Sequence, residues 1–438
     1  WTVVPRNCED VVIDNIKICG GRVMNDDGIN PCNSRRVAIR NCFIRSDDDC
    51  IAVKGLESEY GDCEDITVEN CVFWCDRARI ALLGHESRAA YMRRILFRNC
   101  DVIHSQERNF VFEPGEKMNL EEVLFENIRI ESSSTNALDA AQVAAKDGKK
   151  VDKKPHSLFV IRPAVNMWMR TKAPGAVHDI TLRDITVTGK PIDRDVIVSG
   201  FDAEHMADLV VFENIVVNGK TLNAQDKCVQ IGDFTKSIRF VDSKPDSQGF
   251  RSIFDGKSTD GWHGDPGYIY RDGALVLTKG TKRHYYADPL YSNFVLKLDY
   301  RFEAGGNSGI ALRSPSTQKA EPAYVAMEIQ VLDDLDPSHF KAKPWQHNGS
   351  IYGIVPSKDG FLKPAGQWNS YEITVKDYQV TVRLNDTVIA DANLEQMGFI
   401  RIVPKPGETL KRLVGHVGFT GHGDANIEFK NLRIKVLD

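Results

Sequence analysis

The sequence predicts an all-β protein of two modules, a right-handed parallel β-helix followed by a β-sandwich of jelly-roll type. Three observations predict it. A motif repeats about every 28 residues through the first half of the chain, and the repeat ends at a polar stretch over residues 241–249. After that stretch, short runs of alternating apolar residues are broken by Gly, Asn, Asp and Pro. We therefore expect a β-helix over 1–240, a linker over 241–249 and a sandwich over 250–438.

The repeat places an Asn or Asp between apolar residues that alternate as they do in a strand, which excludes helical repeats. Its successive spacings are 26, 29, 29, 28, 57 and 30 residues, and the spacing of 57 spans two repeats. We expect a hidden copy near residue 156, preceded by a polar, Lys-rich excursion over 132–155. Earlier coils or a cap are expected before the first copy. We expect the repeated side chains to bond the turn backbone and to be structural rather than catalytic: Asn15, Asn41, Asn70, Asn99, Asn127, Asp184 and Asn214.

Three of the ten cysteines directly follow a repeated asparagine, namely Cys42, Cys71 and Cys100. Because a free cysteine packs as a small apolar residue, we predict that these three stack inside the β-helix without disulfides. A bridge such as Cys63 to Cys75 stays open.

The composition excludes some classes of function. A net charge of -5 over 438 residues, with no basic stripe, does not suit a nucleic-acid binder. No apolar run approaches the roughly 20 residues of a membrane helix. The chain begins with Trp1, and no signal peptide is visible.

Acidic residues gather in two adjacent repeats. Asp26 and Asp27 lie in NDDGIN, residues 47–49 are three aspartates in SDDDCIAVKG, and His85 follows one repeat later in LLGHES. Adjacent like charges raise one another's pKa and weaken a sheet, so closely placed carboxylates suggest a function. Solvated acidic turns and a calcium site are the alternatives.

These motifs, in this order, resemble the NTDG, DDC and GHG motifs of the polygalacturonases, glycoside hydrolase family 28, and their family 49 relatives. The resemblance implies that Asp48 donates a proton to the glycosidic oxygen, and that Asp27 and Asp49 hold the attacking water. His85 matches the histidine of GHG. The implied outcome is inversion at the anomeric carbon, without a cofactor.

The chain departs from that family at several positions. Asp26, Asp47 and Glu86 are additional acids. Glu113 stands near the position of the RIK motif, which binds the substrate's carboxylate in that family, and a second carboxylate repels a uronate. The similar letters Arg170-Thr171-Lys172 are expected about three coils away. The sequence therefore favours a neutral oligo- or polysaccharide, or an inactive site.

The second half resembles the 3-keto-disaccharide hydrolase family, whose fold is a concanavalin-like jelly roll. The resemblance is carried by FDGK, NSGIALR, EIQVLD, GSIYG, QWN and FKNLRI. It implies a catalytic Glu328 with sugar-binding partners at Arg313, Gln330, Tyr352, Trp368 and His422. A base at Glu328 could remove the acidic C2 proton of a 3-keto sugar.

The residues leave other readings of this module open. Glu328 and Gln330 could line a lectin-like groove without chemistry, and a divalent metal such as calcium could bind at Asp333, Asp334 and Asp336. For the whole chain, the sequence predicts a secreted or periplasmic glycoside hydrolase, a location that rests on the resemblance alone. The alternative is a non-catalytic protein with two glycan-binding modules.

Overall fold

The computed structural model describes residues 1–20, 25–105, 108–132, 157–189, 195–282, 284–316, 326–400 and 410–437. The chain divides into two compact units, 1–242 and 243–438, so the boundary falls inside the stretch predicted as a linker. Across the described ranges no α-helix is present and no helix could cross a membrane. Three short 3₁₀ turns occur: η1 (Ser58–Tyr60), η2 (Pro337–His339) and η3 (Pro344–Gln346).

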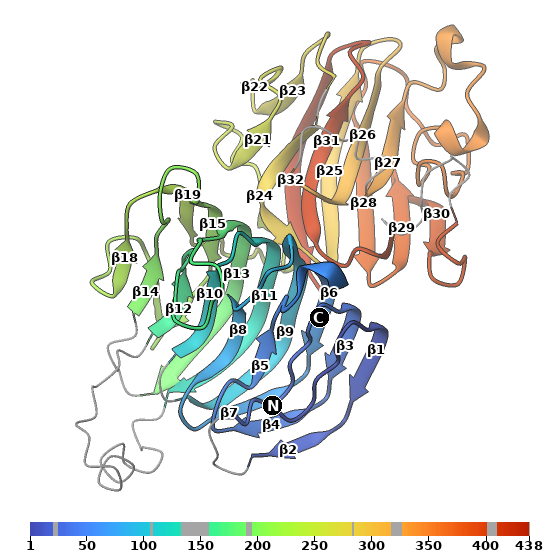
Figure 1. Cartoon of the computed structure of the whole chain (residues 1–438). Helices are drawn as coiled ribbons and strands as arrows, with labels where there is room; N and C mark the ends of the chain where they lie inside the picture. Colours follow the sequence, from blue (N-terminus) through green and yellow to red (C-terminus); the bar gives the residue numbers. More distant parts are fainter. Residues whose placement is uncertain are drawn as a thin grey trace, which may run out of the picture. The chain divides into compact units, whose positions relative to one another are not determined.

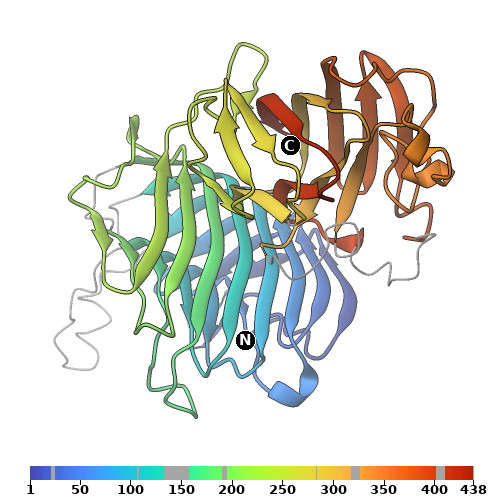
Figure 2. The same cartoon turned by 90° about the horizontal axis from the view of Figure 1, so that it is seen from above.

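The first unit is the predicted parallel β-helix, with about seven turns (Figures 1 and 2). One sheet has thirteen strands, of which eight stack in parallel: β1 (Glu9–Asp14), β3 (Arg35–Arg40), β6 (Cys63–Glu69), β9 (Tyr91–Ser105), β11 (Asn119–Ser132), β13 (Ala176–Gly189), β15 (Ala207–Glu213) and β19 (Thr235–Val241). Its other strands are β2 (Lys17–Cys19), β4 (Phe43–Ser46), β7 (Val72–Cys75), β16 (Val216–Val217) and β17 (Lys220–Thr221).

A second sheet of six parallel strands forms another side of the β-helix. In stacking order they are β5 (Ile51–Val53), β8 (Arg79–His85), β10 (Arg108–Pro114), β12 (Ser157–Ile161), β14 (Asp195–Val198) and β18 (Val229–Ile231). The expected hidden repeat near residue 156 and most of the expected excursion lie outside the described residues.

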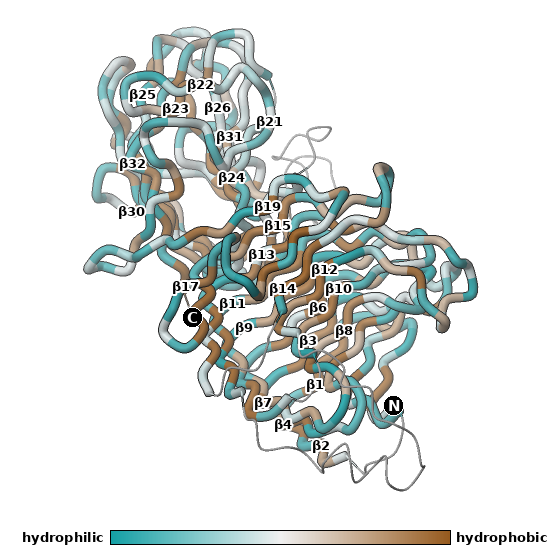
Figure 3. Tube along the Cα trace, turned by 90° about the vertical axis from the view of Figure 1, so that its left-hand side faces the viewer, coloured by the Kyte–Doolittle hydropathy of each residue, from teal (hydrophilic) through white to brown (hydrophobic). Residues whose placement is uncertain are grey.

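Like residues stack on like residues in the core of this unit. Cys42, Cys71 and Cys100 are buried, and all ten cysteines are free, so the stacked thiols are confirmed and a bridge from Cys63 to Cys75 is excluded. Phe97 and Phe125 stack with ring centroids 4.2 Å apart on neighbouring coils. Figure 3 shows hydrophobic segments recurring from coil to coil.

The repeated Asn and Asp residues are structural for a different reason from the one expected. Each has a positive φ, between 51° at Asn127 and 56° at Asn41 and Asn99, which is a left-handed conformation that Asn and Asp tolerate better than most residues. Several of their side-chain bonds run between coils, as from Asn127 Nδ2 to Asn99 Oδ1 at 2.8 Å. The motif therefore marks the corner of each coil.

The second unit is the predicted antiparallel sandwich. One sheet has eight strands: β20 (Arg251–Ser252), β22 (Tyr268–Arg271), β23 (Ala274–Leu277), β25 (Phe294–Phe302), β28 (Asn369–Lys376), β29 (Gln379–Leu384), β30 (Thr387–Asn393) and β32 (Ile427–Val436). The other has five, in the order β21 (Trp262–Gly264), β24 (His284–Tyr291), β31 (Gly415–Gly421), β26 (Asn307–Ser314) and β27 (Met327–Leu332). One apolar core lies between them.

Candidate functional site

The six-stranded sheet of the β-helix has an apolar outer face. Ile51, Val53, Leu83 and Phe112 belong to the core, so the residues that alternate with them point outward. Those residues form a separate buried apolar strip: Ala52, Leu82, Val111 and Val160. Polar and charged side chains gather at both ends of these strands, so this sheet carries the candidate site of the first unit.

Three aspartates meet where β5 begins. The bridge between Ile29 and Ile51 puts Asp27 in register with Asp49 on the next coil, and the Gly28 N–H donates to the Asp49 carbonyl at 2.8 Å. Asp48 precedes Asp49, and the charges of both act on Asp27. The structure therefore brings together the three acids that the sequence singled out.

Asp27 is poised to exchange a proton. Burial, with the neighbouring charge of Asp49, raises the pKa of Asp27 to about 6, although the Asn30 amide donates to its carboxylate at 2.7 Å. Burial also raises the pKa of Asp49, and the Arg79 guanidinium, 3.0 Å from Asp49 Oδ1, opposes that shift. A carboxylate with a pKa near 6 is a stronger base than an ordinary aspartate and is still mostly ionised at neutral pH.

The three additional acids have structural partners. Asp26 accepts the N–H groups of Asp47 at 2.9 Å and of Asp48 at 3.0 Å, and so fixes the backbone that carries the catalytic candidates. Asp47 pairs with Arg77 at 3.0 Å, and Glu86 pairs with Lys54 at 2.9 Å.

The prediction that His85 lies beside the aspartates is wrong. Ile51 pairs with Ala81, so the residue in register with Asp49 is Arg79, at the opposite end of β8 from His85. At one strand rise per residue, the six residues from Arg79 to His85 put the two backbone positions about 20 Å apart. The sequence GHES resembles the GHG motif of the family, but it lies at the end of β8 opposite to Arg79.

His85 instead pairs with Glu113. Its Nε2 lies 2.7 Å from Glu113 Oε2, and Arg162 Nε donates to the other carboxylate oxygen at 2.8 Å. Burial alone would raise the pKa of Glu113, but His85 and Arg162 outweigh it and lower that pKa to about 2. Arg108, five residues earlier on β10, also approaches Glu113 to 3.8 Å, so long side chains extend along the strand over the apolar strip.

The expectation that Arg170 to Lys172 lie three coils from His85 is also wrong. The segment between β12 and β13 folds back, so that the N–H groups of Arg170 and Thr171 donate to Glu116 Oε1 at 2.8 and 2.9 Å. Glu116 follows the end of β10, one strand from His85. A regular solenoid would not bring these residues together, but a loop that leaves the solenoid does.

In the sandwich, Glu328 and Gln330 point away from the core, because they alternate with the buried Met327, Ile329 and Val331. The Thr420 hydroxyl donates to Glu328 Oε1 at 2.6 Å, and Gln330 Nε2 donates to Asn307 Oδ1 at 2.8 Å. A Cβ on Gly309 would lie 1.6 Å from Glu328 Oε1, so this glycine leaves room for the carboxylate. The Tyr352 N–H donates to the Glu328 carbonyl at 2.9 Å, which places the backbone of Tyr352 beside that of Glu328, and the sugar-binding role of Tyr352 stays a prediction.

Sequence reasoning missed a group of histidines on the same outer face. The ring of Tyr286 lies 4.8 Å from that of His416 and 5.3 Å from that of His284, and His263 pairs with Asp288. The signal was the period-2 pattern of polar residues on β24, where His284, Tyr286 and Asp288 alternate with core residues. In register, His284 opposes Thr420, the partner of Glu328. His284 is therefore the member of this group that the strand register ties to Glu328, through Thr420.

Two residues expected near Glu328 have other roles. Arg313 is only 1% exposed, and its guanidinium donates to backbone carbonyls of Ser292, Asp377 and Arg412, so it is structural here rather than sugar-binding. Trp368 stacks with Lys430, 3.8 Å from its ring centroid, and with Arg301.

Lys430 and Arg301 alternate with the core residues Phe429, Tyr300 and Phe302, so Trp368 lies on the outer face of the other sheet. That position corrects the prediction for Trp368, because the core separates it from Glu328. His422 is exposed just beyond β31, two residues from Thr420, and its sugar-binding role stays a prediction.

The calcium alternative in the sandwich stays a prediction. Asp333 and Asp336 accept N–H groups of Gly305 and Ser338, and Asp334 accepts from Asn348. Within the described parts of the chain, no group of three or more His, Cys, Asp or Glu residues could hold a metal ion.

Comparisons with known proteins match the two units separately. A model described as 3-keto-alpha-glucoside-1,2-lyase-like domain matches residues 249–435, and the model for Glycosyl hydrolases family 28 matches residues 2–154. The 3-keto-disaccharide hydrolase of Bacteroides thetaiotaomicron is 30% identical over 235 residues, which cover 44% of this chain and 80% of that protein.

The matches of the β-helix cover smaller shares of the relatives. A Vitis vinifera protein named Probable polygalacturonase is 42% identical over 62 residues, 14% of this chain and 13% of that protein. The solved family 28 exopolygalacturonase of Yersinia enterocolitica is 18% identical with a TM-score of 0.39, covering 54% of this chain and 40% of that one. The chain thus spans less than half of either relative.

The raised pKa of Asp27 predicts how the stability of the fold depends on pH. As pH rises from about 4 to 6, the unfolded chain loses this proton before the folded chain does, so the carboxyl costs stability above pH 6. Asp27→Asn should therefore be more stable than the wild type at pH 7.5, by about 1–3 kcal/mol, with the gain shrinking at pH 4. Urea unfolding of both proteins at pH 4 and at pH 7.5 measures this difference in the free energy of unfolding.

Glu113→Gln is the matched control, because the pKa of Glu113 is lowered and its loss should destabilise the fold at pH 7.5. Equal or lower stability of Asp27→Asn at pH 7.5 would contradict the prediction.

Proposed function

Because the chain belongs to the 3-keto-disaccharide hydrolase family and its β-helix resembles glycosyl hydrolases family 28, we propose that it is a hydrolase that uses Asp27, Asp48 and Asp49 to cleave glycosidic bonds. The observation that carries the proposal is the register of Asp27 with Asp49 on neighbouring coils. Carboxylates that the fold places side by side can act as acid and base on one bond.

The proposed reaction is a single displacement. Asp48 donates its proton to the glycosidic oxygen, and the bond from that oxygen to the anomeric carbon breaks. A water molecule attacks the anomeric carbon from the opposite side while Asp27 accepts its proton, and the configuration inverts. Asp49, held by Arg79, orients the water. The raised pKa of Asp27 supports its role as the base.

We propose a neutral glycan as the substrate of this site. Four cations of the site already pair with carboxylates: Lys54 with Glu86, Arg79 with Asp49, and Arg108 and Arg162 with Glu113. A uronate would have to take a cation from one of these partly buried acids and leave that acid without its partner, which is costly. A neutral sugar needs only hydrogen bonds. We also propose that the reaction takes place in the periplasm or outside the cell, a location that rests on the family resemblance alone.

The sandwich, in this proposal, acts on 3-keto glycosides. Glu328 removes the C2 proton, which the C3 carbonyl makes acidic, and the electron pair forms a C1–C2 double bond as the C1–O bond breaks. The released oxygen takes a proton from a nearby acid, for which His284 is suitably placed across from Thr420. Water addition at C1 then gives the free 3-keto sugar. An oxidation elsewhere must supply the keto group.

Variants of the full chain separate the two activities. Asp48→Asn should lower hydrolysis of unoxidised neutral glycans at least about 100-fold, because it removes the proton donor, and should leave 3-keto glycoside cleavage unchanged. Glu328→Gln should lower the cleavage of 3-keto glycosides and leave the hydrolysis of unoxidised neutral glycans unchanged. Release of reducing sugar from both substrate classes measures this. If neither variant changes turnover while both weaken glycan binding, the chain is a non-catalytic two-module binding protein.

Substrate charge gives an independent test. Polygalacturonate should be hydrolysed more slowly than neutral glycans, because a uronate finds its cations already paired. Galacturonate release is compared with neutral sugar release at equal substrate mass and at two salt concentrations. Faster galacturonate release at both concentrations would show that the proposed preference is wrong.

A further inference from the structure

The segment over residues 162–175 crosses back over the turn that follows β10. Near its start, the Ala164 N–H donates to the Pro114 carbonyl at 3.0 Å. Near its end, the Glu116 N–H donates to the Ala173 carbonyl at 2.7 Å, and Pro174 forms an antiparallel bridge with Gly115. Both ends of the loop are therefore fixed to the same turn of the β-helix.

The tip of the loop is fixed as well. Met169 is only 2% exposed and lies against Gly115, where an added Cβ would come within 2.0 Å of Met169 Cε. Lys172 Nζ donates to the carbonyls of Asn166, Met167 and Met169 at 2.8, 3.2 and 2.6 Å. Lys172 and the buried carboxylate of Glu116 thus stabilise the conformation of the loop itself.

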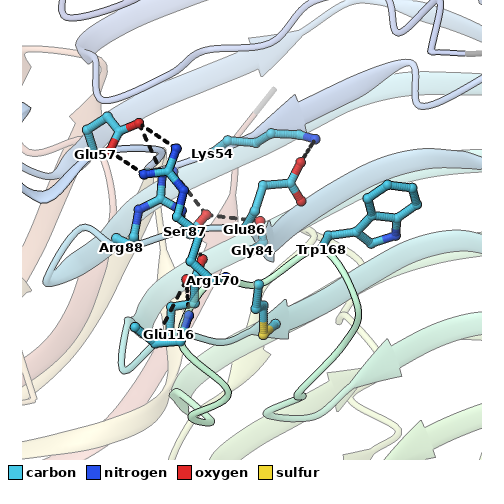
Figure 4. Close-up of polar contacts among 12 residues, drawn as sticks. Lys54, Glu57, Gly84, Glu86, Ser87, Arg88, Glu116, Trp168 and Arg170 are labelled. Carbon is cyan, nitrogen blue, oxygen red and sulfur yellow. Dashed lines mark hydrogen bonds and ion pairs between the residues drawn. The ribbon is translucent and has the colours of Figure 1, made fainter.

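At the tip of the loop, the indole of Trp168 is exposed to solvent. Trp168 is 63% exposed and its neighbour Met167 is 80% exposed. Pro114 pairs with His85, so Gly115, beneath Met169, is level with Glu86 on the next strand. Figure 4 shows Trp168 on the same side of the sheet as Glu86 and Lys54. A large apolar side chain that the core does not need, exposed on the same side of the sheet as a polar pair, is typical of a ligand surface.

We infer that Trp168 is the stacking platform of a subsite for a neutral pyranose, an inference that rests on the proposed function of the β-helix. The apolar face of a sugar ring can lie on the indole, and Lys54 and Glu86 can supply a donor and an acceptor to its hydroxyls. Because these two charges already compensate each other, the subsite favours a ring without charge.

The subsite extends from the cleavage point along the strands: the charge of Lys54 acts on Asp27 and Asp49, whereas Glu86 stands farther away. Glu86 stands seven residues beyond Arg79, the partner of Asp49, so the backbone separation along the strand is roughly 20 Å. A chain of several sugar rings can span that distance, and a short glycoside cannot. Loss of Trp168 should therefore weaken the binding of oligosaccharides long enough to reach it.

Calorimetric titration of the full chain tests the inference. Tetrasaccharides of glucose, galactose, mannose and xylose are the neutral probes, and tetragalacturonate is the charged one, all in an Asp48→Asn background to prevent turnover. At least one neutral probe should bind, Trp168→Ala should weaken it at least about tenfold, and Trp168→Phe should keep part of the affinity. Met167→Ala, the matched control on the same loop, should change affinity less than about twofold.

The inference is wrong if no neutral probe binds, if Trp168→Ala binds like its parent, or if tetragalacturonate binds tightest. Turnover of neutral glycans by Asp48→Asn separates this outcome from a failure of the proposed chemistry. Undiminished turnover would contradict the chemistry and leave the binding result intact.

Discussion

In-register stacking of coils is the constraint on which the β-helix and its site depend. Each side chain lies beside the residue one coil earlier and the residue one coil later, so that around the aspartates positions 22 to 30 residues apart become neighbours. Like charges in such a row repel each other unless the next coil supplies an opposite charge. The site follows this rule, because Asp27 and Asp49 are followed by Arg79 in the same row.

The same stacking explains how far sequence reasoning could go. The period near 28 residues predicts the fold because each repeat marks a corner whose Asn or Asp adopts a positive φ. The three aspartates were found because NDDGIN and SDDDC each stand at the start of a coil's strand. His85 was misplaced because its motif was matched by letters, whereas neighbours are decided by strand register. Counting from Ile51 to Ala81 leads to Arg79 instead.

Other features had weak signals or none in the sequence. The return of residues 162–175 over the turn after β10 depends on buried contacts of Glu116 and Met169 that no local pattern reveals. In the sandwich, the residues around Glu328 come from strands distant in sequence, so motif order alone missed His284 and His416. The prediction that Arg313 binds sugar was wrong, because burial rather than residue type decides whether a guanidinium can contact a ligand.

The buried acids of the β-helix are costly to the fold, and the chain offsets that cost with paired cations at most of them. Asp26 instead accepts backbone N–H groups, and Asp27 has an amide as its described side-chain partner and keeps a raised pKa. A residue that weakens the fold at neutral pH and stands in register with a second carboxylate is the physical basis for proposing acid and base chemistry there.

The stereochemistry of the product tests this account most directly. Proton NMR can follow the anomeric signals during the first minutes of hydrolysis of a neutral glycan by the full chain, before mutarotation mixes the anomers. A single displacement at Asp27, Asp48 and Asp49 predicts that the first product has the inverted configuration. A first product with retained configuration would contradict the account, because it requires a covalent intermediate that this arrangement of roles does not include.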